Sequence, residues 1–145
     1  EALIWQGIAL SSEAGAKGGL GALSIAKAAK QQLEAAIKLD GNALKGSAYT
    51  SLGTRYFKVP GWPIGFGDKE RAEELMKKAL AINPNGIDPN FFYADYLVER
   101  ARYDDALRHL DTALKAPARP GRELADAGRR QEIQALIAKV RKEME

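Results

Sequence analysis

The stretch from Asp68 to Pro84, DKERAEELMKKALAINP, constrains the fold more than any other part of this 145-residue chain. Its apolar residues follow the spacing of one helix face, Asp68 is suited to cap the helix start, and Asn83 and Pro84 end it. The same order of small and large apolar residues returns 34 residues later. The matched pairs are Ala72 with Ala106, Met76 with Leu110, Ala79 with Ala113, and Leu80 with Leu114. This period indicates repeated helical hairpins.

The composition narrows the function classes without naming one. The chain is 46% hydrophobic and 28% charged, which is ordinary for a globular domain with a core. It has no cysteine, which excludes disulfides, thiolate metal sites and cysteine nucleophiles. No stretch reaches the roughly 18 to 20 apolar residues that a membrane-spanning helix needs, so we expect no membrane span. No signal peptide is visible and the chain starts at Glu1, which leaves both a cytoplasmic and a periplasmic location open.

The net charge of +3 is concentrated at the C-terminal end. Residues 115–145 contain eight Lys and Arg residues against five Asp and Glu residues, whereas the rest of the chain is balanced. Nucleic-acid-binding proteins usually have a denser basic stripe with interleaved aromatic residues. We therefore expect a solvated terminal helix with extra arginines and no nucleic-acid partner.

Periodicity and breakers divide the chain into a series of helices. A glycine-rich segment, residues 15–22, reads as a flexible connection, since it lacks the Lys-Ser/Thr pair of a phosphate-binding loop. Residues 58–68, KVPGWPIGFGD, hold two prolines and three glycines and predict an irregular loop. Gly53 costs a helix about 1 kcal/mol relative to Ala, so it indicates a second helix packed closely against it. The expected helices span residues 1–14, 23–39, 42–57, 68–84, 89–100, 104–115 and, within the last segment, 122–144.

These helices predict an all-α solenoid that forms a single domain over residues 1–145. We expect three helical hairpins and a C-terminal capping helix. The hairpins span about 1–41, 42–84 and 87–117, and the capping helix spans about 122–144.

The pattern resembles the tetratricopeptide repeat family. The middle hairpin carries the resemblance at Tyr49, Leu52, Gly53, Tyr56, Ala72, Met76, Ala79 and Pro84. The last hairpin carries it at Tyr93, Ala94, Leu97, Ala106, Leu110 and Ala113, and the first at Trp5, Ala9, Ala29, Leu33 and Ala36. The loop between the helices of the middle hairpin is seven residues longer than in the last hairpin. The extra length is the segment around Trp62.

A narrower resemblance covers about a third of the chain. The run from Pro60 to Leu97 is similar to the T-component proteins associated with TRAP transporters. This resemblance implies a bacterial, periplasmic transport accessory that docks a solute-binding protein or shelters a hydrophobic ligand. Lipid anchoring, common in that family, has no lipobox cysteine to support it here.

Residues suited to catalysis are few, and we expect a noncatalytic protein without metal or cofactor. His109 is the only histidine, and Asp105, one turn before it, shares its helix face. We interpret His109 as a surface residue in an ion pair, because a metal site would need further ligands from elsewhere. The pairs Glu73-Glu74 and Asp104-Asp105 are adjacent in sequence and therefore point to different faces.

A binding surface is the stronger prediction, because stacked hairpins form a concave groove from the first helix of each pair. The inner-face positions are counted from Gly53 and Ala94. They are Ser47, Thr50, Thr54, Phe57 and Lys58 in the middle hairpin, and Asp88, Phe91, Asp95, Val98 and Glu99 in the last. These residues offer few of the cations that clamp a peptide carboxylate. The predicted partner is a protein or peptide in this groove, with Trp62 and Phe66 serving either as loop anchors or as part of the site.

Overall fold

The computed structural model describes residues 3, 4, 6 and 19–145, and its elements are helices joined by turns. Among the described residues, the β-structure consists of a single bridge between Gly61 and Gly67. The chain divides into two compact units, residues 1–82 and 83–145. The helices are α2 (Gly19–Asp40), η1 (Ala43–Gly46), α3 (Ser47–Lys58), α4 (Lys69–Ile82), α5 (Ile87–Glu99), α6 (Tyr103–Leu114) and α7 (Glu123–Glu143). The prediction of an all-α chain of paired helices is confirmed.

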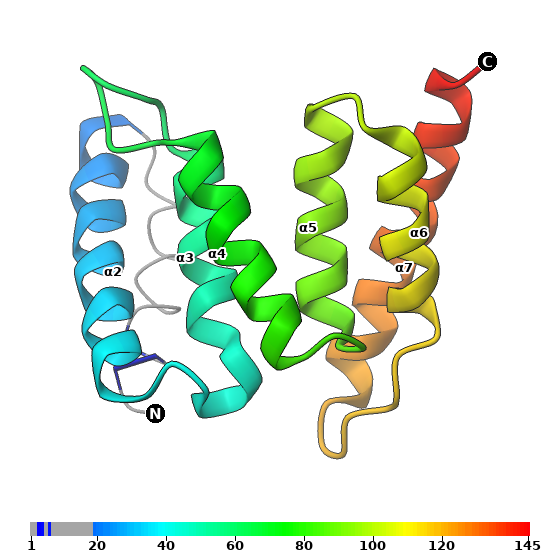
Figure 1. Cartoon of the computed structure of the whole chain (residues 1–145), viewed down its shortest axis with the longest axis horizontal. Helices are drawn as coiled ribbons and strands as arrows, with labels where there is room; N and C mark the ends of the chain where they lie inside the picture. The colour runs from blue at the N-terminus through cyan, green and yellow to red at the C-terminus, as the bar shows by residue number, and fades with distance from the viewer. Residues whose placement is uncertain (1–2, 5, 7–18) are drawn as a thin grey trace. The chain divides into compact units, whose positions relative to one another are not determined.

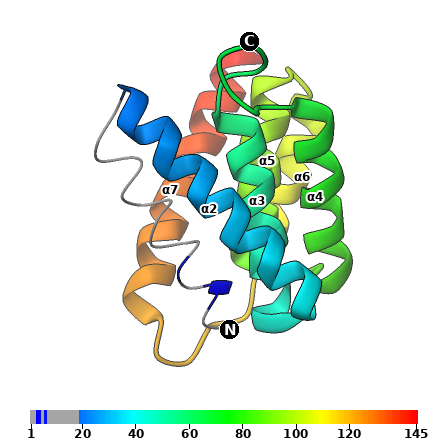
Figure 2. The same ribbon diagram turned by 90° about the vertical axis from the view of Figure 1, so that its left-hand side faces the viewer.

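In the first unit, α3 and α4 form a hairpin and α2 packs against α3 (Figure 1). Figure 2 views this unit from the α2 side, with α2 lying across α3. The apolar faces of these helices meet in one core, which removes their side chains from water. The fully enclosed members of this core are Ile4, Leu33, Ala36, Ala48, Leu52 and Leu75.

Gly53 allows α3 and α4 to approach closely, as predicted. A methyl group at this position would lie 3.0 Å from Cγ of Met76 and 3.2 Å from the backbone oxygen of Ala72. The start of α4 also confirms its prediction. Oδ1 of Asp68 accepts a hydrogen bond of 3.1 Å from the backbone N–H of Arg71, which is the expected helix cap.

The third predicted helix, residues 42–57, begins later than expected. Leu44, Lys45 and Gly46 all have positive φ angles, and α3 starts only at Ser47. The hydroxyl group of Ser47 donates a 2.6 Å hydrogen bond to the carbonyl oxygen of Leu44, which fixes this turn. Gly46 also packs against Ile82 at the end of α4, where a methyl group would meet it at 3.2 Å. The turn between α2 and α3, packed against the end of α4, therefore replaces the predicted start of the helix.

The glycine-rich segment is also shorter than predicted, because α2 already begins at Gly19. Residues 19–22 are thus helical, and the rest of the segment lies outside the described residues, as does most of the helix predicted over residues 1–14.

The second unit contains α5, α6 and α7, and α7 packs against both other helices. As a result α5 is buried on most of its surface, including Ile87, Tyr96 and Leu97. The prediction that α6 begins at Asp104 is wrong by one residue. The helix starts one residue earlier at Tyr103, so Asp104 lies in its first turn. Its carboxylate still favours the helix, since negative charge is stabilised near a helix N-terminus.

Candidate interaction site

The loop between α3 and α4, residues 59–68, is irregular but internally hydrogen-bonded. Its two ends are joined by the backbone N–H of Asp68, which donates to the carbonyl of Tyr56 at 2.9 Å, and by that of Gly67, which donates to the carbonyl of Pro60 at 2.9 Å. At its tip, the N–H groups of Ile64 and Gly65 both donate to the carbonyl of Gly61 at 3.2 Å. The loop therefore holds a defined shape in spite of its length.

Two glycines make this shape possible through close backbone contact. A methyl group at Gly67 would lie 1.8 Å from the backbone oxygen of Val59, and one at Gly65 would lie 2.6 Å from that of Pro60. The same position at Gly65 is 3.3 Å from Cδ1 of Leu23, so the loop also packs against the beginning of α2 (Figure 1). Only glycine fits these two sites without moving the backbone.

The large side chains of the loop have opposite environments. Phe66 is half-buried and packs edge to face on Tyr56, with ring centroids 5.5 Å apart and an angle of 80° between the planes. Trp62 is 89% exposed and Ile64 is 69% exposed. Phe66 is thus the anchor, while Trp62, Pro63 and Ile64 form a projecting apolar tip, called the Trp62 tip below.

The predicted groove positions of α3 are only partly available to a ligand. Thr50 is buried, which corrects its assignment to an open surface. The hydroxyl of Thr54 donates a 2.9 Å hydrogen bond to the carbonyl of Thr50, and that of Ser47 is engaged in the turn before α3. Phe57 is half-buried with the ammonium group of exposed Lys58 4.5 Å from its ring centroid. The last two positions adjoin the loop that carries the Trp62 tip.

The predicted groove positions of α5 differ in exposure, and α7 covers part of them. Phe91 and Val98 are buried, so their assignment to an open surface is corrected as well. The guanidinium group of Arg129 lies 4.8 Å from the ring centroid of Phe91 and 4.7 Å from that of Phe92. Because α7 packs along α5, it supplies this cover. Asp95 is half-buried, and Glu99 is exposed.

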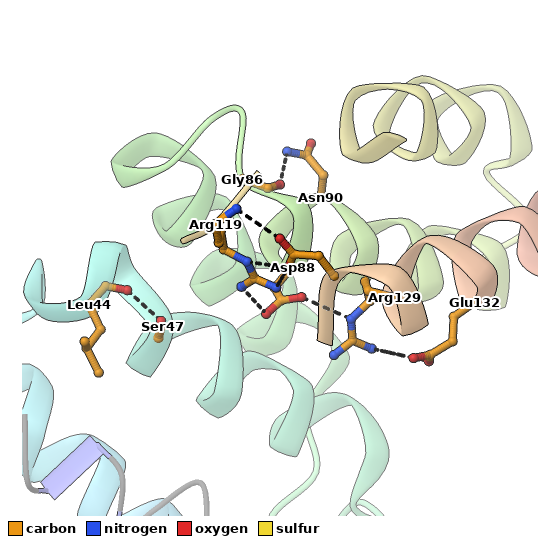
Figure 3. A network of polar contacts seen from close by, with 9 residues as sticks. Leu44, Ser47, Gly86, Asp88, Asn90, Arg119, Arg129 and Glu132 are labelled. Atoms are coloured by element: carbon orange, nitrogen blue, oxygen red, sulfur yellow. Dashed lines mark hydrogen bonds and ion pairs between the residues drawn. The ribbon is translucent and has the colours of Figure 1, made fainter. Parts of the chain in front are cut away.

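Asp88, another predicted groove residue, accepts hydrogen bonds from two arginines (Figure 3). One oxygen is 3.1 Å from Arg119 and the other is 3.0 Å from Arg129 in α7. Arg129 also contacts Glu132 at 3.3 Å. The carboxylate of Asp88 is therefore neutralised within its own unit and ties α5 to α7.

Arg119 joins a second carboxylate to this network. Its Nε donates to Oδ1 of buried Asp126 at 2.7 Å, and its backbone N–H donates to Oδ2 at 3.1 Å. The hydrogen bond from Arg119 lowers the pKa of Asp126. Burial opposes the charge on Arg119, but Asp126 and Asp88 outweigh it and raise the pKa of that guanidinium. We call Asp88, Arg119, Asp126 and Arg129 the arginine clamp.

A further arginine, Arg130, donates to the carbonyl oxygens of Leu114 and Ala116 at the end of α6. The C-terminal arginines were expected to be solvated, and this expectation is wrong for Arg119, Arg129 and Arg130. Each is partly buried and hydrogen-bonded to another segment of the second unit.

His109 is partly buried and hydrogen-bonds to Asn90 instead of forming a surface ion pair, which corrects its interpretation. The amide nitrogen of Asn90 donates to the carbonyls of Pro84 at 2.9 Å and Gly86 at 2.8 Å, so its Oδ1 faces Nδ1 of His109 at 2.8 Å. Nδ1 must then carry the proton. Burial, followed by the nearby charge of Arg108, lowers the pKa of His109. Figure 3 shows Asn90 beside Gly86.

Ile64 and Asn90 are among the residues whose roles were not identified from the sequence. Ile64 follows a proline and precedes a glycine, so it has no helix or strand in which to be buried. Its exposure could have been predicted from these two neighbours. Asn90 is 1% exposed and corresponds to Tyr49 of the middle hairpin. A polar amide in place of an aromatic ring indicates that Asn90 makes hydrogen bonds inside the unit.

Metal and membrane sites find no support in the described part of the chain. Its His, Asp and Glu residues form no group of three or more that could hold a metal ion. Within the same residues, no helix combines the length and the apolar character that crossing a bilayer requires.

The structure first defines a class: an all-α chain built from helical hairpins, with small residues at the closest helix contacts. A family model described as "Tetratricopeptide repeat" matches residues 64–140, more than half of the chain. The chain therefore belongs to the tetratricopeptide repeat family. Repeats of this family are in general protein–protein interaction modules and typically noncatalytic scaffolds. The comparison with curated proteins found no match. The narrower resemblance to T-component proteins stays a prediction.

Proposed function

We propose that this chain is a noncatalytic interaction module that binds a partner protein through the Trp62 tip and the adjoining end of α3. The observation that carries the proposal is that an 89% exposed tryptophan stands on a loop whose shape is fixed by hydrogen bonds and close glycine contacts. Exposed tryptophan is unfavourable in water, and aromatic anchors of this kind supply much of the energy at protein interfaces.

The shape of the tip indicates the kind of surface that it fits. Trp62, Pro63 and Ile64 are consecutive and project together, so they form a small knob. A knob buries most of its surface in a concave apolar pocket and much less on a flat face. The partner should therefore be a folded protein that supplies the pocket, with Phe57 and Lys58 at the rim of the contact.

The groove positions that keep some exposure remain part of this proposal in each unit. These are Ser47, Thr54, Phe57 and Lys58 in the first unit, and Asp88, Asp95 and Glu99 in the second. Buried Thr50, Phe91 and Val98 contribute to packing, so replacing them would test stability instead of recognition.

Replacing Trp62 with Ala tests the proposal. Proteins captured by the immobilised full chain are identified by mass spectrometry, and each is then purified and titrated by calorimetry. Trp62→Ala should weaken binding at least tenfold, because truncating a central aromatic anchor costs about 2 kcal/mol or more. The melting temperature should change little, since the side chain makes few contacts in the free protein.

Leu39→Ala is the matched control, because Leu39 is 78% exposed in the same unit but lies at the end of α2. It should bind like the wild type. A partner that Trp62→Ala binds with unchanged affinity would show that the tip is not the contact. Equal weakening by both variants would indicate nonspecific apolar capture and would contradict the proposal in the same way.

A further inference from the structure

The Trp62 tip is held by a contact from α2 that involves a charged residue. Lys30 lies in α2, and its ammonium group is 5.8 Å from the ring centroid of Tyr56 in α3 and 5.6 Å from that of Phe66 in the loop. A cation at this distance from an aromatic face is attracted by the ring. Lys30 therefore lies within cation–π distance of both rings of the pair that anchors the loop, and it links three segments of the first unit.

Lys30 keeps its charge in this half-buried place because Glu34 lies one turn further along α2. The ammonium nitrogen is 2.7 Å from Oε1 of Glu34, and the side chain of Lys30 is 26% exposed. The ion pair with Glu34 raises the pKa of Lys30 in spite of burial, with a further contribution from Tyr56. Glu34 also fixes the direction of the lysine side chain, which leaves the ammonium group over the rings.

The ring pair beside Lys30 lies at the base of the loop, next to the hydrogen bonds that close it. Phe66 lies next to Gly67, whose N–H donates to Pro60, and the carbonyl of Tyr56 accepts from Asp68 at 2.9 Å. The two hydrogen bonds that close the loop thus flank the ring pair under Lys30. Movement of the Phe66 ring would open the base of the loop, and the tip would lose its fixed direction.

From this geometry we propose that Lys30 is a positioning residue for the Trp62 tip. Its ammonium group holds the Tyr56–Phe66 ring pair in place, an interaction called the lock below. The lock keeps the tip ordered before a partner binds. The role in recognition rests on the proposed function. The order of the loop is a property of the free protein and is measured without any partner.

Hydrogen exchange of the full-length chain, followed residue by residue by NMR, tests the lock. Lys30→Met keeps the length of the side chain and removes the charge. The amides of Gly67 and Asp68 should exchange about three to ten times faster, because the cation–π attraction to the two rings is lost. Amides in the middle of α4 should keep their rates, since the helix core is unchanged.

Two further variants separate the lock from a general structural effect. Lys30→Arg should restore slow exchange, because a guanidinium group can occupy the same place over the rings and pair with Glu34. Lys27→Met removes an exposed lysine one turn earlier in α2 and should leave the loop amides unaffected.

Unchanged exchange at Gly67 and Asp68 in Lys30→Met would overturn the inference and leave the proposed function standing. Equal acceleration of loop and helix amides would overturn it too, because that result means global destabilisation. Faster loop exchange alone supports the lock. If Trp62→Ala then bound its partner normally, the proposed function would fail while the lock remained.

Discussion

Gly53 and Gly128 take corresponding places in the repeat, yet their surroundings differ. Ala94 occupies the place of Gly53 in the next hairpin, and Gly128 follows Ala94 by 34 residues. A methyl group at Gly53 would press on Met76 and on the backbone of Ala72, whereas a methyl group at Gly128 meets nothing within 4 Å. Close helix packing therefore requires a glycine at position 53 in α3, whereas no neighbouring atom requires one at position 128 in α7.

Gly53→Ala and Gly128→Ala should change stability in opposite directions. Gly128→Ala should raise the free energy of unfolding by about 0.5 to 1 kcal/mol, because alanine favours the helix. Gly53→Ala should lower it by about 1 kcal/mol, since the cost of overpacking exceeds this gain. Urea denaturation followed by circular dichroism measures both. Stabilisation by Gly53→Ala would show that Met76 can move aside and that the close approach is not required.

His109 predicts a pH dependence that can be assigned to one side chain, because the chain has no other histidine. Its pKa is lowered in the folded protein, so the unfolded chain binds the proton more readily. Stability should thus be full above about pH 6.5, the usual histidine value, and should fall as the pH drops below it. One proton sets a limit of about 1.4 kcal/mol per pH unit.

Thermal or urea unfolding between pH 7.5 and pH 5 measures this effect. His109→Asn supplies an N–H group near the place of Nδ1 without titrating, so it should flatten the curve. An equally steep curve for His109→Asn would assign the effect to other groups.

At the scale of elements, the arginine clamp joins α5, the segment after α6, and α7. Arg119→Met should lower the free energy of unfolding by about 2 kcal/mol or more, because it leaves the buried carboxylate of Asp126 without its partner. The double variant with Asp126→Asn should lose less than the sum of the two single variants. Additive losses in this double-mutant cycle would show that the two side chains act independently.

The helices themselves were largely predictable, whereas their ends and partners were not. Asp68 and Pro84 mark α4 because capping and termination are local effects. The positive φ angles of Leu44 and Lys45 belong to the turn between α2 and α3, which packs against α4, and the identity of those two residues does not predict them. The pairing of Asp88 with Arg119, 31 residues away, depends on tertiary structure in the same way.

At the scale of the whole molecule, the repeat period predicted the paired helices, and the family match confirms that reading. It could not predict which positions stay exposed. Phe91 and Trp62 are both aromatic residues at places suited to binding, yet one is 8% exposed and the other 89%. The difference arises because α7 covers Phe91, whereas the loop turns Trp62 outward and buries Phe66 in its place.

The second unit has the contacts of a folding unit of its own, which gives a last prediction. Leu97, Leu110, Ile133 and Val140 are buried and come from three helices that pack on one another, and the arginine clamp lies wholly within residues 83–145.

A fragment of residues 83–145 should therefore be helical and unfold cooperatively, with a lower melting temperature than the full chain because so small a core is marginal. Circular dichroism during heating measures this. Leu110→Ala, which costs about 2 to 5 kcal/mol in a core, should abolish the transition in the fragment. A gradual, noncooperative loss of helix in the unmodified fragment would show that residues 1–82 are needed for its fold.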